Sequence, residues 1–460
     1  MYRADTIVAC ATPAGRGAIA IVRCSGRDAL AVSQALFRPR GQGAPEPWRM
    51  RLGTVMAADG VTAVDEALGV FFPAPHSFTG EDTFEVHCHG SPVVVEQVLA
   101  SAIAAGARAA DRGEFTRRAV LNGKLDLLQA EAIADLIDAR MVGGAAAAWK
   151  QLQGALSGEF EAIRASLLAV LAEVEAEVDF TDDELPAPEF GRRSQVLERV
   201  ATRLQALLQG FAASRRQREG WRVVFTGRPN AGKSSLVNRL LGSGRMIVSD
   251  EAGTTRDVVE ETVDLGGVAF VLTDTAGIRE AGGAAETIAV ARALASVAEA
   301  DLCVLVLDAS LGPFDPAAAG EPIALGIDGG FTLVVLNKTD LGLHIPADVV
   351  EGYRAGGAVV LEASARTGQG CAEVASALVS AASERMAGDV AGISRLRHRA
   401  ALEKALEPLE RACRLVISEA GAELAAVELR TALAELSTIS RPLDNEEVLD
   451  LIFSEFCIGK

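Results

Sequence analysis

The stretch "GRPNAGKS" at residues 227–234 restricts the fold more than any other part of the sequence. It matches the pattern G-x-x-x-x-G-K-[ST], and it lies between the strand-like run "RVVFT" and a helical pattern. Gly227 and Gly232 let the backbone turn so that its N–H groups converge on phosphate oxygens. We therefore expect a nucleotide-binding α/β domain in which Lys233 reaches the β- and γ-phosphates and Ser234 binds Mg²⁺.

The segment "NKTD" at 337–340 follows the strand-like run "TLVVL" and indicates which base is bound. The Asp340 carboxylate can accept hydrogen bonds from the N1–H and N2 amino group of guanine. Adenine would leave this buried carboxylate unpaired, at a cost of about 1–3 kcal/mol or more. Asn337 suits the acceptor edge of guanine, Lys338 can pack over the base, and "SAR" at 364–366 can close the pocket. Three motifs in this order predict a GTP site.

Two further segments, "GTTRD" and "DTAG", lie between those motifs. Thr255 is the candidate for completing Mg²⁺ coordination, Asp274 would hold the metal through water, and the Gly277 N–H would sense the γ-phosphate. The next residue is Ile278, where many small GTPases have a glutamine that orients the attacking water. Because Ile278 cannot do this, either another group takes that role or the nucleotide is not hydrolysed.

The rest of the sequence predicts a multidomain α+β and α/β fold, as expected at 460 residues. Residues 1–120 mix short β-like runs with Gly and Pro, and they predict a small α+β domain. Helical periodicity covers 121–218 and returns at 381–460. Between these segments, 219–380 alternates strand-like and helical runs, which predicts a doubly wound parallel sheet inserted into one discontinuous all-α domain.

Composition excludes some classes of function. The formal charge of −18 argues against sequence-independent coating of nucleic acid, although "SRRQRE" at 214–219 and the segment from 394 concentrate basic residues. Solvated helix faces are the simpler interpretation of each basic run. No apolar run could span a bilayer, and seven cysteines lie without a CxxC pair. We expect a cytoplasmic protein with reduced thiols and no membrane association.

Motifs along essentially the whole chain resemble one family. They are "DTIVACATPAGRGAIAIVRCSG", "SFTGEDTFEVHCHGSP", "GEFTRRAVLNGKLDLLQAEAIADLIDA", "GRPNAGKSSLVNRLL", "DEAGTTRD", "DTAGIRE" and the terminal "CIGK", and they are similar to hallmarks of the tRNA-modifying GTPases of the MnmE (TrmE) family. The resemblance implies a folate-binding N-terminal domain that dimerises into a homodimer, a helical domain and an inserted Ras-like P-loop GTPase domain.

The same resemblance implies a reaction and its partners. The FAD-dependent protein MnmG would join the homodimer in a heterotetramer that acts on tRNA. Together they would add an aminomethyl or carboxymethylaminomethyl group to C5 of the wobble uridine of certain tRNAs. The one-carbon unit would come from 5-formyltetrahydrofolate or another tetrahydrofolate derivative.

The resemblance also implies what replaces the missing glutamine. A potassium ion, bound where two G domains meet, would take the place of an arginine finger, whose assistance is worth roughly 10³–10⁵ in rate. Glu286 would orient the attacking water. The ion would be held by side-chain oxygens of Asn230 and Thr254 and by backbone carbonyls of Ser249 and Glu251. On the residues alone, Asn230 is simply a turn residue and Glu286 an acid at a helix N-terminus.

With the resemblance included, the predicted sites can be given in full. The GTP-binding set is Asn230, Ala231, Gly232, Lys233, Ser234, Ser235, Ser249, Asp250, Glu251, Ala252, Gly253, Thr254, Thr255, Asp274, Thr275, Ala276, Gly277, Asn337, Lys338, Thr339, Asp340, Ser364, Ala365 and Arg366. The catalytic set is Glu286, Asn230, Lys233, Arg256 and Cys457, the last being a C-terminal thiol of unassigned chemistry.

Four positions match folate-binding residues of the family: Arg23, Glu81, Lys124 and Lys460. A pterin has an amide and amino edge like that of guanine, which suits a carboxylate, and the glutamate tail of folate suits Arg and Lys. From the sequence alone, each would more simply be a surface ion-pair member. His87 and His89 share a strand face and could bind a metal, but a structural or folate-adjacent role is preferred because no further ligands have recognisable spacing.

Two other functions compete with this one. A ribosome-assembly GTPase of the Era or Der type shares the G-domain motifs, but this chain has a single phosphate loop and no GXXG-centred KH pattern. A nucleotide-binding scaffold without hydrolysis is permitted by Ile278, whereas Glu286 and the potassium loop argue against it.

Overall fold

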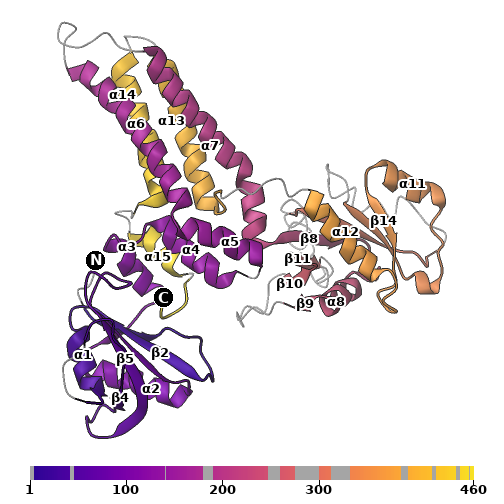
Figure 1. Cartoon of the computed structure of the whole chain (residues 1–460). Coiled ribbons are helices and arrows are strands. Elements are labelled where there is room, and N and C mark those ends of the chain that lie inside the picture. Colours follow the sequence, from indigo (N-terminus) through magenta and orange to yellow (C-terminus); the bar gives the residue numbers. More distant parts are fainter. Residues whose placement is uncertain are drawn as a thin grey trace, which may run out of the picture. The chain divides into compact units, whose positions relative to one another are not determined.

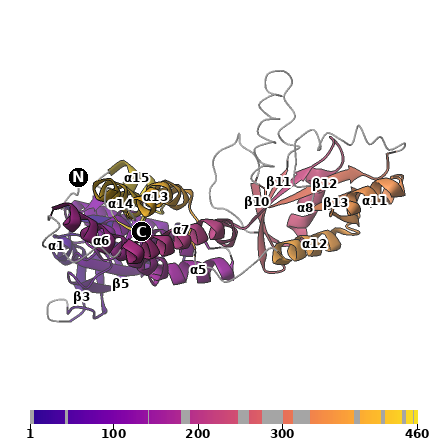
Figure 2. The ribbon, with the colours of Figure 1, turned by 90° about the horizontal axis from the view of Figure 1, so that it is seen from above.

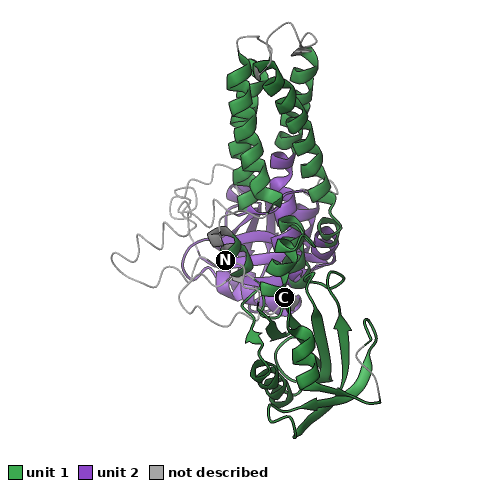
Figure 3. Ribbon diagram, turned by 90° about the vertical axis from the view of Figure 1, so that its left-hand side faces the viewer, with its two compact units in different colours: residues 1–137, 149–206, 396–460 green, residues 138–148, 207–395 purple. Residues whose placement is uncertain are grey.

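The computed structural model describes residues 5–41, 46–139, 141–179, 190–246, 260–274, 300–311, 332–384, 392–416, 421–441, 446–454 and 456–460. Contacts between residues divide the chain into two units, drawn in different colours in Figure 3. Unit 1 comprises Met1–Ile137, Trp149–Ala206 and Leu396–Lys460, and unit 2 comprises Asp138–Ala148 and Leu207–Arg395.

Unit 1 begins with a seven-stranded sheet in the order β3-β4-β5-β6-β2-β1-β7. Its strands are β1 (Ile7–Cys10), β2 (Ile19–Ser25), β3 (Phe37–Pro39), β4 (Arg51–Met56), β5 (Ala63–Phe72), β6 (Thr83–His89) and β7 (Arg108–Ala109). Helices α1 (Ala29–Leu36) and α2 (Pro92–Ala104) pack against this sheet (Figure 1). Because strand side chains alternate, buried Val22 and Val86 face the helices, while half-buried Arg23 and Glu85 lie on the opposite face.

The rest of unit 1 is helical. Its elements are α3 (Glu114–Leu121), α4 (Leu127–Asp138), α6 (Ala155–Asp179), α13 (Leu396–Leu415), α14 (Ala422–Ser440) and α15 (Glu446–Ser454). Two helices are divided between the units: α5 (Val142–Leu152) begins in unit 2, and α7 (Phe190–Glu219) ends in it. Helix α14 packs against both α13 and α6, and ion pairs such as Arg203–Glu159 join α7 to α6. Helices that precede and follow the second sheet in the sequence therefore form one bundle (Figure 1).

Buried charges join the two sequence segments of this bundle. Glu131 on α4 is 1% exposed, and Arg397 Nε of α13 donates a hydrogen bond to its Oε1 at 2.6 Å. His398 Nε2 lies 2.8 Å from Glu131 Oε2, and Arg397 also donates to the carbonyls of Thr438 (3.0 Å) and Ile439 (3.2 Å) near the end of α14. Burial would raise the pKa of Glu131, but His398 and Arg397 hold it below its ordinary value.

Unit 2 contains a second seven-stranded sheet, in the order β14-β13-β12-β8-β11-β10-β9. Its strands are β8 (Trp221–Thr226), β9 (Arg245–Met246), β10 (Glu260–Leu265), β11 (Val268–Asp274), β12 (Leu302–Asp308), β13 (Leu333–Asn337) and β14 (Val359–Glu362). The five neighbouring strands β14, β13, β12, β8 and β11 pair in parallel, and β10 pairs antiparallel with β11 and β9. The central strands read as continuous apolar runs because both of their faces are buried.

Helices cover both faces of this second sheet. Helices α8 (Lys233–Ser243) and α12 (Cys371–Glu384) contact each other and share one core with the strands (Figure 2). Helix α11 (Ala347–Ala355) packs on a separate core that includes Leu305 and Val334. This doubly wound arrangement, together with the α+β and helical parts of unit 1, confirms the predicted fold class.

The basic runs noted in the sequence are largely ion-paired in the structure. On α7, Arg216 Nε donates to Asp301 Oδ1 at 2.7 Å, and Arg215 and Arg218 both pair with Glu219. On α13, Arg411 pairs with two glutamates on its own and a neighbouring helix. These arginines pair with acids of the protein itself, whereas Arg397 and His398 of the second basic run lie in the buried cluster with Glu131, so solvated helix faces do not describe that run completely. Among the described helices, none has the length and apolarity that crossing a membrane requires.

Candidate functional site

The phosphate loop joins the end of β8 to the start of α8 and depends on two glycines. Gly227 has a φ of +138° and Gly232 a φ of +94°, values that other residues rarely adopt. A Cβ atom on Gly227 would lie 2.2 Å from the carbonyl oxygen of Val306, and one on Gly232 would lie 2.2 Å from Asn337 Nδ2. Neighbouring backbone and side-chain atoms therefore leave no room for a Cβ atom at either position, and the two glycines allow the loop to form a cradle.

Lys233 lies inside that cradle. Its side chain is 4% exposed, and Nζ donates hydrogen bonds to the carbonyls of Gly227 and Arg228, both at 2.9 Å. Ser234 and Ser235 follow on the exposed first turn of α8, whose N–H groups give this end of the helix a positive potential. A buried ammonium, a turn of N–H groups and an exposed hydroxyl form a donor set that fits a nucleotide phosphate with Mg²⁺.

Asn337 links the phosphate loop to the "SAR" loop. The side chain is 1% exposed, its Nδ2 donates to the carbonyl of Ala231 at 2.9 Å, and its Oδ1 accepts from the Ala365 N–H at 3.0 Å. The sequence predicted that this side chain would meet the acceptor edge of guanine. Its described contacts are with backbone and fix two loops against each other, while the contact with guanine stays a prediction.

Asp340 is oriented by neighbours from the "SAR" loop. Ser364 Oγ donates to Asp340 Oδ1 at 2.5 Å, and Arg366 forms an ion pair with the same carboxylate. The Ser364 hydrogen bond, with support from Arg366, lowers the pKa of Asp340. An ionised carboxylate at this position suits the N1–H and N2 donors of guanine. Thr339 Oγ1 donates to the carbonyl of Ala363 at 3.1 Å, which holds this segment beside that loop.

Two residues that the sequence analysis did not single out also organise this pocket. Asp308 ends β12 and accepts from Lys338 Nζ at 2.6 Å, so Lys338 is held by a carboxylate at the pocket edge. Arg239 on α8 donates to the carbonyls of Ala365 (3.3 Å) and Arg366 (2.9 Å). Asp308 could have been predicted from the sequence because it ends an apolar strand-like run. The carboxyl ends of parallel strands lie together at one edge of a sheet, where ligands bind. Arg239 has no sequence signal of this kind.

Much of the predicted switch region lies outside the described residues. Asp274 ends β11, and its backbone is in register with Phe225 of β8, beside the start of the phosphate loop. The other predicted residues of this region, which lie outside the described ranges, are Ser249, Asp250, Glu251, Ala252, Gly253, Thr254, Thr255, Arg256, Thr275, Ala276, Gly277 and Glu286. Their roles stay predictions. Asn230 is described: it is exposed and has a φ of +65°.

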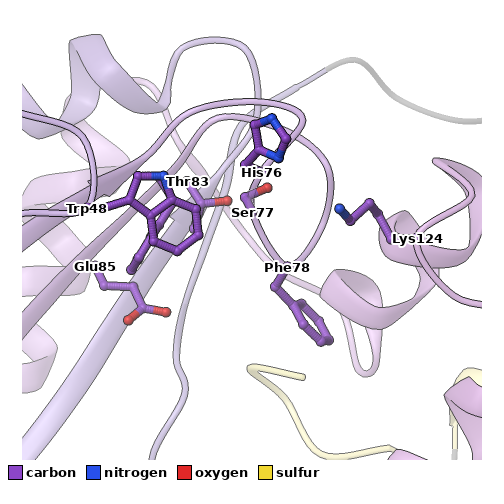
Figure 4. Close-up of a pocket in the computed structure, with 8 residues that line it drawn as sticks. Trp48, His76, Ser77, Phe78, Thr83, Glu85 and Lys124 are labelled. Carbon is purple, nitrogen blue, oxygen red and sulfur yellow. The ribbon is translucent and has the colours of Figure 1, made fainter. Parts of the chain in front are cut away.

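A second candidate site is a pocket of about 650 Å³ in the N-terminal part of unit 1. Figure 4 shows the residues that line it, which are Trp48, Phe72, His76, Ser77, Phe78, Thr83, Glu85 and Lys124. The rings of Trp48 and Phe72 meet edge to face with centroids 4.9 Å apart. Aromatic walls with a few polar groups are typical of a site for a flat heteroaromatic ligand.

One of the four predicted folate residues lines this pocket, and two others contact its lining residues. Lys124 lines it, and its Nζ donates to the carbonyl of Pro75 at 3.1 Å. Arg23 Nε donates at 2.7 Å to Oε1 of the lining residue Glu85, and its guanidinium lies 5.5 Å from the Phe78 ring centroid. Glu81 is not a lining residue, but its backbone carbonyl accepts from Oγ of the lining residue Ser77 at 2.5 Å and from Oγ1 of the lining residue Thr83 at 3.2 Å.

The fourth predicted folate residue comes from the end of the sequence. Ile458 forms a β-bridge with Arg112, and the Lys460 carbonyl accepts from the Phe115 N–H at 3.2 Å. A Cβ on Gly459 would lie 2.1 Å from the carbonyl oxygen of Cys10, so only glycine allows this approach. Burial, with the positive charge of Arg23, lowers the pKa of Lys460. Cys457 in the same segment is exposed.

The two histidines on β6 have carboxylate partners. His87 Nε2 lies 3.3 Å from Glu85 Oε2, and His89 Nδ1 lies 2.8 Å from Asp65 Oδ1. Within the described part of the chain, no group of three or more His, Cys, Asp or Glu side chains is placed to hold a metal ion. The contacts of His87 with Glu85 place it next to the aromatic pocket.

Comparisons with known proteins cover nearly the whole chain. A family model for the MnmE helical domain matches residues 127–457, and one for the GTP-binding protein TrmE N-terminus matches residues 6–124. Proteins named "tRNA modification GTPase MnmE" from Heliobacterium modesticaldum and Roseiflexus sp. are 40% and 44% identical, each over 99% of both chains. One from Parvibaculum lavamentivorans is 42% identical over 99% of this chain and 100% of its own. The chain therefore belongs to the tRNA modification GTPase MnmE family.

Proposed function

We propose that this protein binds and hydrolyses GTP with Mg²⁺ as its part in tRNA modification. The observation that carries the proposal is the nucleotide pocket, in which buried Lys233, the glycine cradle and the oriented Asp340 carboxylate lie at one edge of a doubly wound sheet. Family membership supports the tRNA-modifying role. The Era or Der type alternative gains no support, because the family models match outside the G domain as well.

In the proposed reaction, each described residue of the pocket has a separate task. The phosphate-loop N–H groups and Lys233 Nζ stabilise the charge of the β- and γ-phosphates, and the Ser234 hydroxyl is a metal ligand. Asp340 selects guanine, while Asn337 keeps the base pocket at a fixed distance from the phosphate loop. When bound, Mg²⁺ supplies charge that offsets the negative charge of the phosphates.

We further propose that K⁺ stimulates hydrolysis. The exposed, left-handed conformation of Asn230 supports this, because a side chain on the outer surface of the loop could reach an ion shared with a second copy in a homodimer. Thr254, Ser249 and Glu251 would complete the ion site, and Glu286 would orient the water. Ile278 contributes nothing to water orientation in this scheme.

We also propose that the aromatic pocket binds a tetrahydrofolate such as 5-formyltetrahydrofolate. Its aromatic walls suit the pterin and aminobenzoyl rings, and Lys124, Arg23 and Lys460 suit the carboxylates of the glutamate tail. With the FAD-dependent partner MnmG, the protein would transfer this one-carbon unit to C5 of the wobble uridine in the cytoplasm. The proposed domains are 1–120 for folate, 121–218 with 381–460 for the bundle, and 219–380 for GTP.

The experiment that tests the GTPase proposal is hydrolysis by the purified protein in KCl and in NaCl at matched ionic strength. Matching is needed because surface electrostatics respond to salt in general. Stimulation by K⁺ that is lost in Asn230→Ala is the expected result. Equal, slow rates in both salts would reject the potassium mechanism, and no hydrolysis in either salt would leave only a nucleotide-binding scaffold.

A further inference from the structure

A buried arginine lies behind the predicted folate carboxylate. Arg118 on α3 is 2% exposed, and its Nη1 lies 3.3 and 3.2 Å from the two carboxylate oxygens of Glu81. Its remaining donors are held by other groups: Nη1 donates to the carbonyl of Asp5 at 2.7 Å, and Nη2 donates to Asp5 Oδ1 at 2.6 Å and Glu114 Oε1 at 2.9 Å. With so little exposed surface, Arg118 cannot itself contact a ligand in the pocket.

A buried serine contacts the same carboxylate. Ser25 ends β2, has no exposed surface, and donates from Oγ to Glu81 Oε2 at 2.8 Å. A serine hydroxyl has one proton, so the 2.7 Å contact between Ser25 Oγ and Thr79 Oγ1 requires Thr79 to donate. Thr79 Oγ1 in turn accepts from the Glu81 N–H at 3.2 Å. Both the backbone and the side chain of Glu81 are therefore held by neighbours.

The charged groups around Glu81 form one network. Three carboxylates, those of Asp5, Glu81 and Glu114, pair with Arg118, and Arg108 also pairs with Asp5 and Glu114. Burying charge in this way contributes little net stability compared with apolar packing. What it does achieve is a fixed carboxylate orientation, which lowers the entropy lost when a ligand with two matching donors binds.

We propose that Arg118 and Ser25 are positioning residues that hold the Glu81 carboxylate in the orientation required by the amide and amino edge of a pterin. The proposal rests on the proposed folate function. It assigns no ligand contact to either residue: Arg118 fixes both oxygens of the carboxylate from the protein side, and Ser25 fixes the second oxygen from the end of β2.

The test measures 5-formyltetrahydrofolate affinity by calorimetry on the full-length chain. Ser25→Ala and Arg118→Lys are each expected to weaken binding roughly 10-fold, the effect of losing a hydrogen bond to a charged group. Two matched control variants change residues of unit 1 that do not contact Glu81. Ser33→Ala replaces a buried serine that donates to the Leu30 carbonyl. Arg117→Lys replaces the neighbour of Arg118 on α3, whose partner is Asp450 of α15. The controls should retain wild-type affinity, and thermal unfolding checks that all four variants are folded.

A double-mutant cycle separates positioning from general destabilisation. If Ser25 acts through Glu81, then Ser25→Ala costs nothing further in a Glu81→Gln background. Additive losses, or equal losses in the Ser33 and Arg117 controls, would overturn the proposal. If Arg118→Lys proves unstable, the Ser25 cycle decides alone. Failure of the wild type to bind the folate would instead reject the proposed folate function, which keeps the two results distinct.

Discussion

The two units build their candidate sites from different parts of the polypeptide. In unit 2, the nucleotide pocket consists mainly of loops that follow parallel strands, and backbone atoms of glycines 227 and 232 form much of it. In unit 1, the aromatic pocket is lined by side chains from β5, from β6 and the segment between these two strands, and by Trp48 and Lys124. Ligand binding at a backbone site should therefore be lost on substitution of a few glycines. At a side-chain site, ligand binding should depend on many residues, each with a smaller effect.

The largest effect should come from adding one methyl group to the backbone site. Gly227→Ala would bring a Cβ atom against the Val306 carbonyl at a φ of +138°, and neither atom can move without shifting a strand. We expect loss of measurable GDP binding by fluorescence titration. The control is Gly242→Ala in α8, which has open space around it and should be neutral or stabilising by up to about 1 kcal/mol. Wild-type affinity in Gly227→Ala would contradict the backbone description.

The next largest effect concerns buried charge in unit 1. Glu131→Gln would leave Arg397 and His398 with a neutral partner, and we expect unit 1 to lose about 3–5 kcal/mol of unfolding free energy. Because the folded-state pKa of Glu131 is lowered, its contribution is complete above the unfolded value of 4.5 and is lost as the pH falls below it. Chemical denaturation between pH 7 and pH 3 measures this: the variant should show a shallower decline than the wild type, and parallel curves would contradict the prediction.

Asn337 offers a test of whether the nucleotide pocket depends on links between its loops. Asn337→Ala would leave the Ala231 carbonyl and the Ala365 N–H without this partner, at about 1–3 kcal/mol for an unsatisfied group. We expect GDP affinity to fall roughly 10-fold to 100-fold by calorimetry. Asn122→Ala, which removes a similar side-chain bond to the Thr79 carbonyl in unit 1, is the matched control and should leave GDP affinity unchanged. Equal losses in both would indicate a nonspecific effect.

The smallest effect is expected in the side-chain site. Trp48 is 60% exposed, so Trp48→Ala should cost little stability while removing one wall of the pocket. Stacking of a ring on an aromatic side chain is worth about 1–3 kcal/mol, so 5-formyltetrahydrofolate affinity should fall roughly 10-fold. Trp149→Ala, an exposed tryptophan of unit 1 that is not a lining residue, provides the control. A larger loss in the control would show that exposure rather than the pocket explains the effect.

The sequence predicted the fold class and the phosphate loop because both depend on short-range patterns. Glycine spacing in "GRPNAGKS" and the continuous apolar strands were sufficient, since each acts within about ten residues. The bond between Asn337 and Ala231 spans 106 residues, and no local pattern encodes it. Trp48 and Phe78 were not predicted as lining residues because isolated aromatics are normally core residues. The buried position of Arg118 likewise depends on acids far away in sequence.

The ion pair between Glu131 and Arg397 has a consequence for how the protein is made. These residues are 266 positions apart, and all of residues 207–395 lies between them. At about 5–20 residues per second, a ribosome needs roughly 13–53 s after Glu131 to reach Arg397. Unit 2 therefore leaves the exit tunnel and has its own core available while the bundle is still missing two of its helices. We therefore expect nested folding during translation, with the inserted unit completed before the domain that encloses it in sequence.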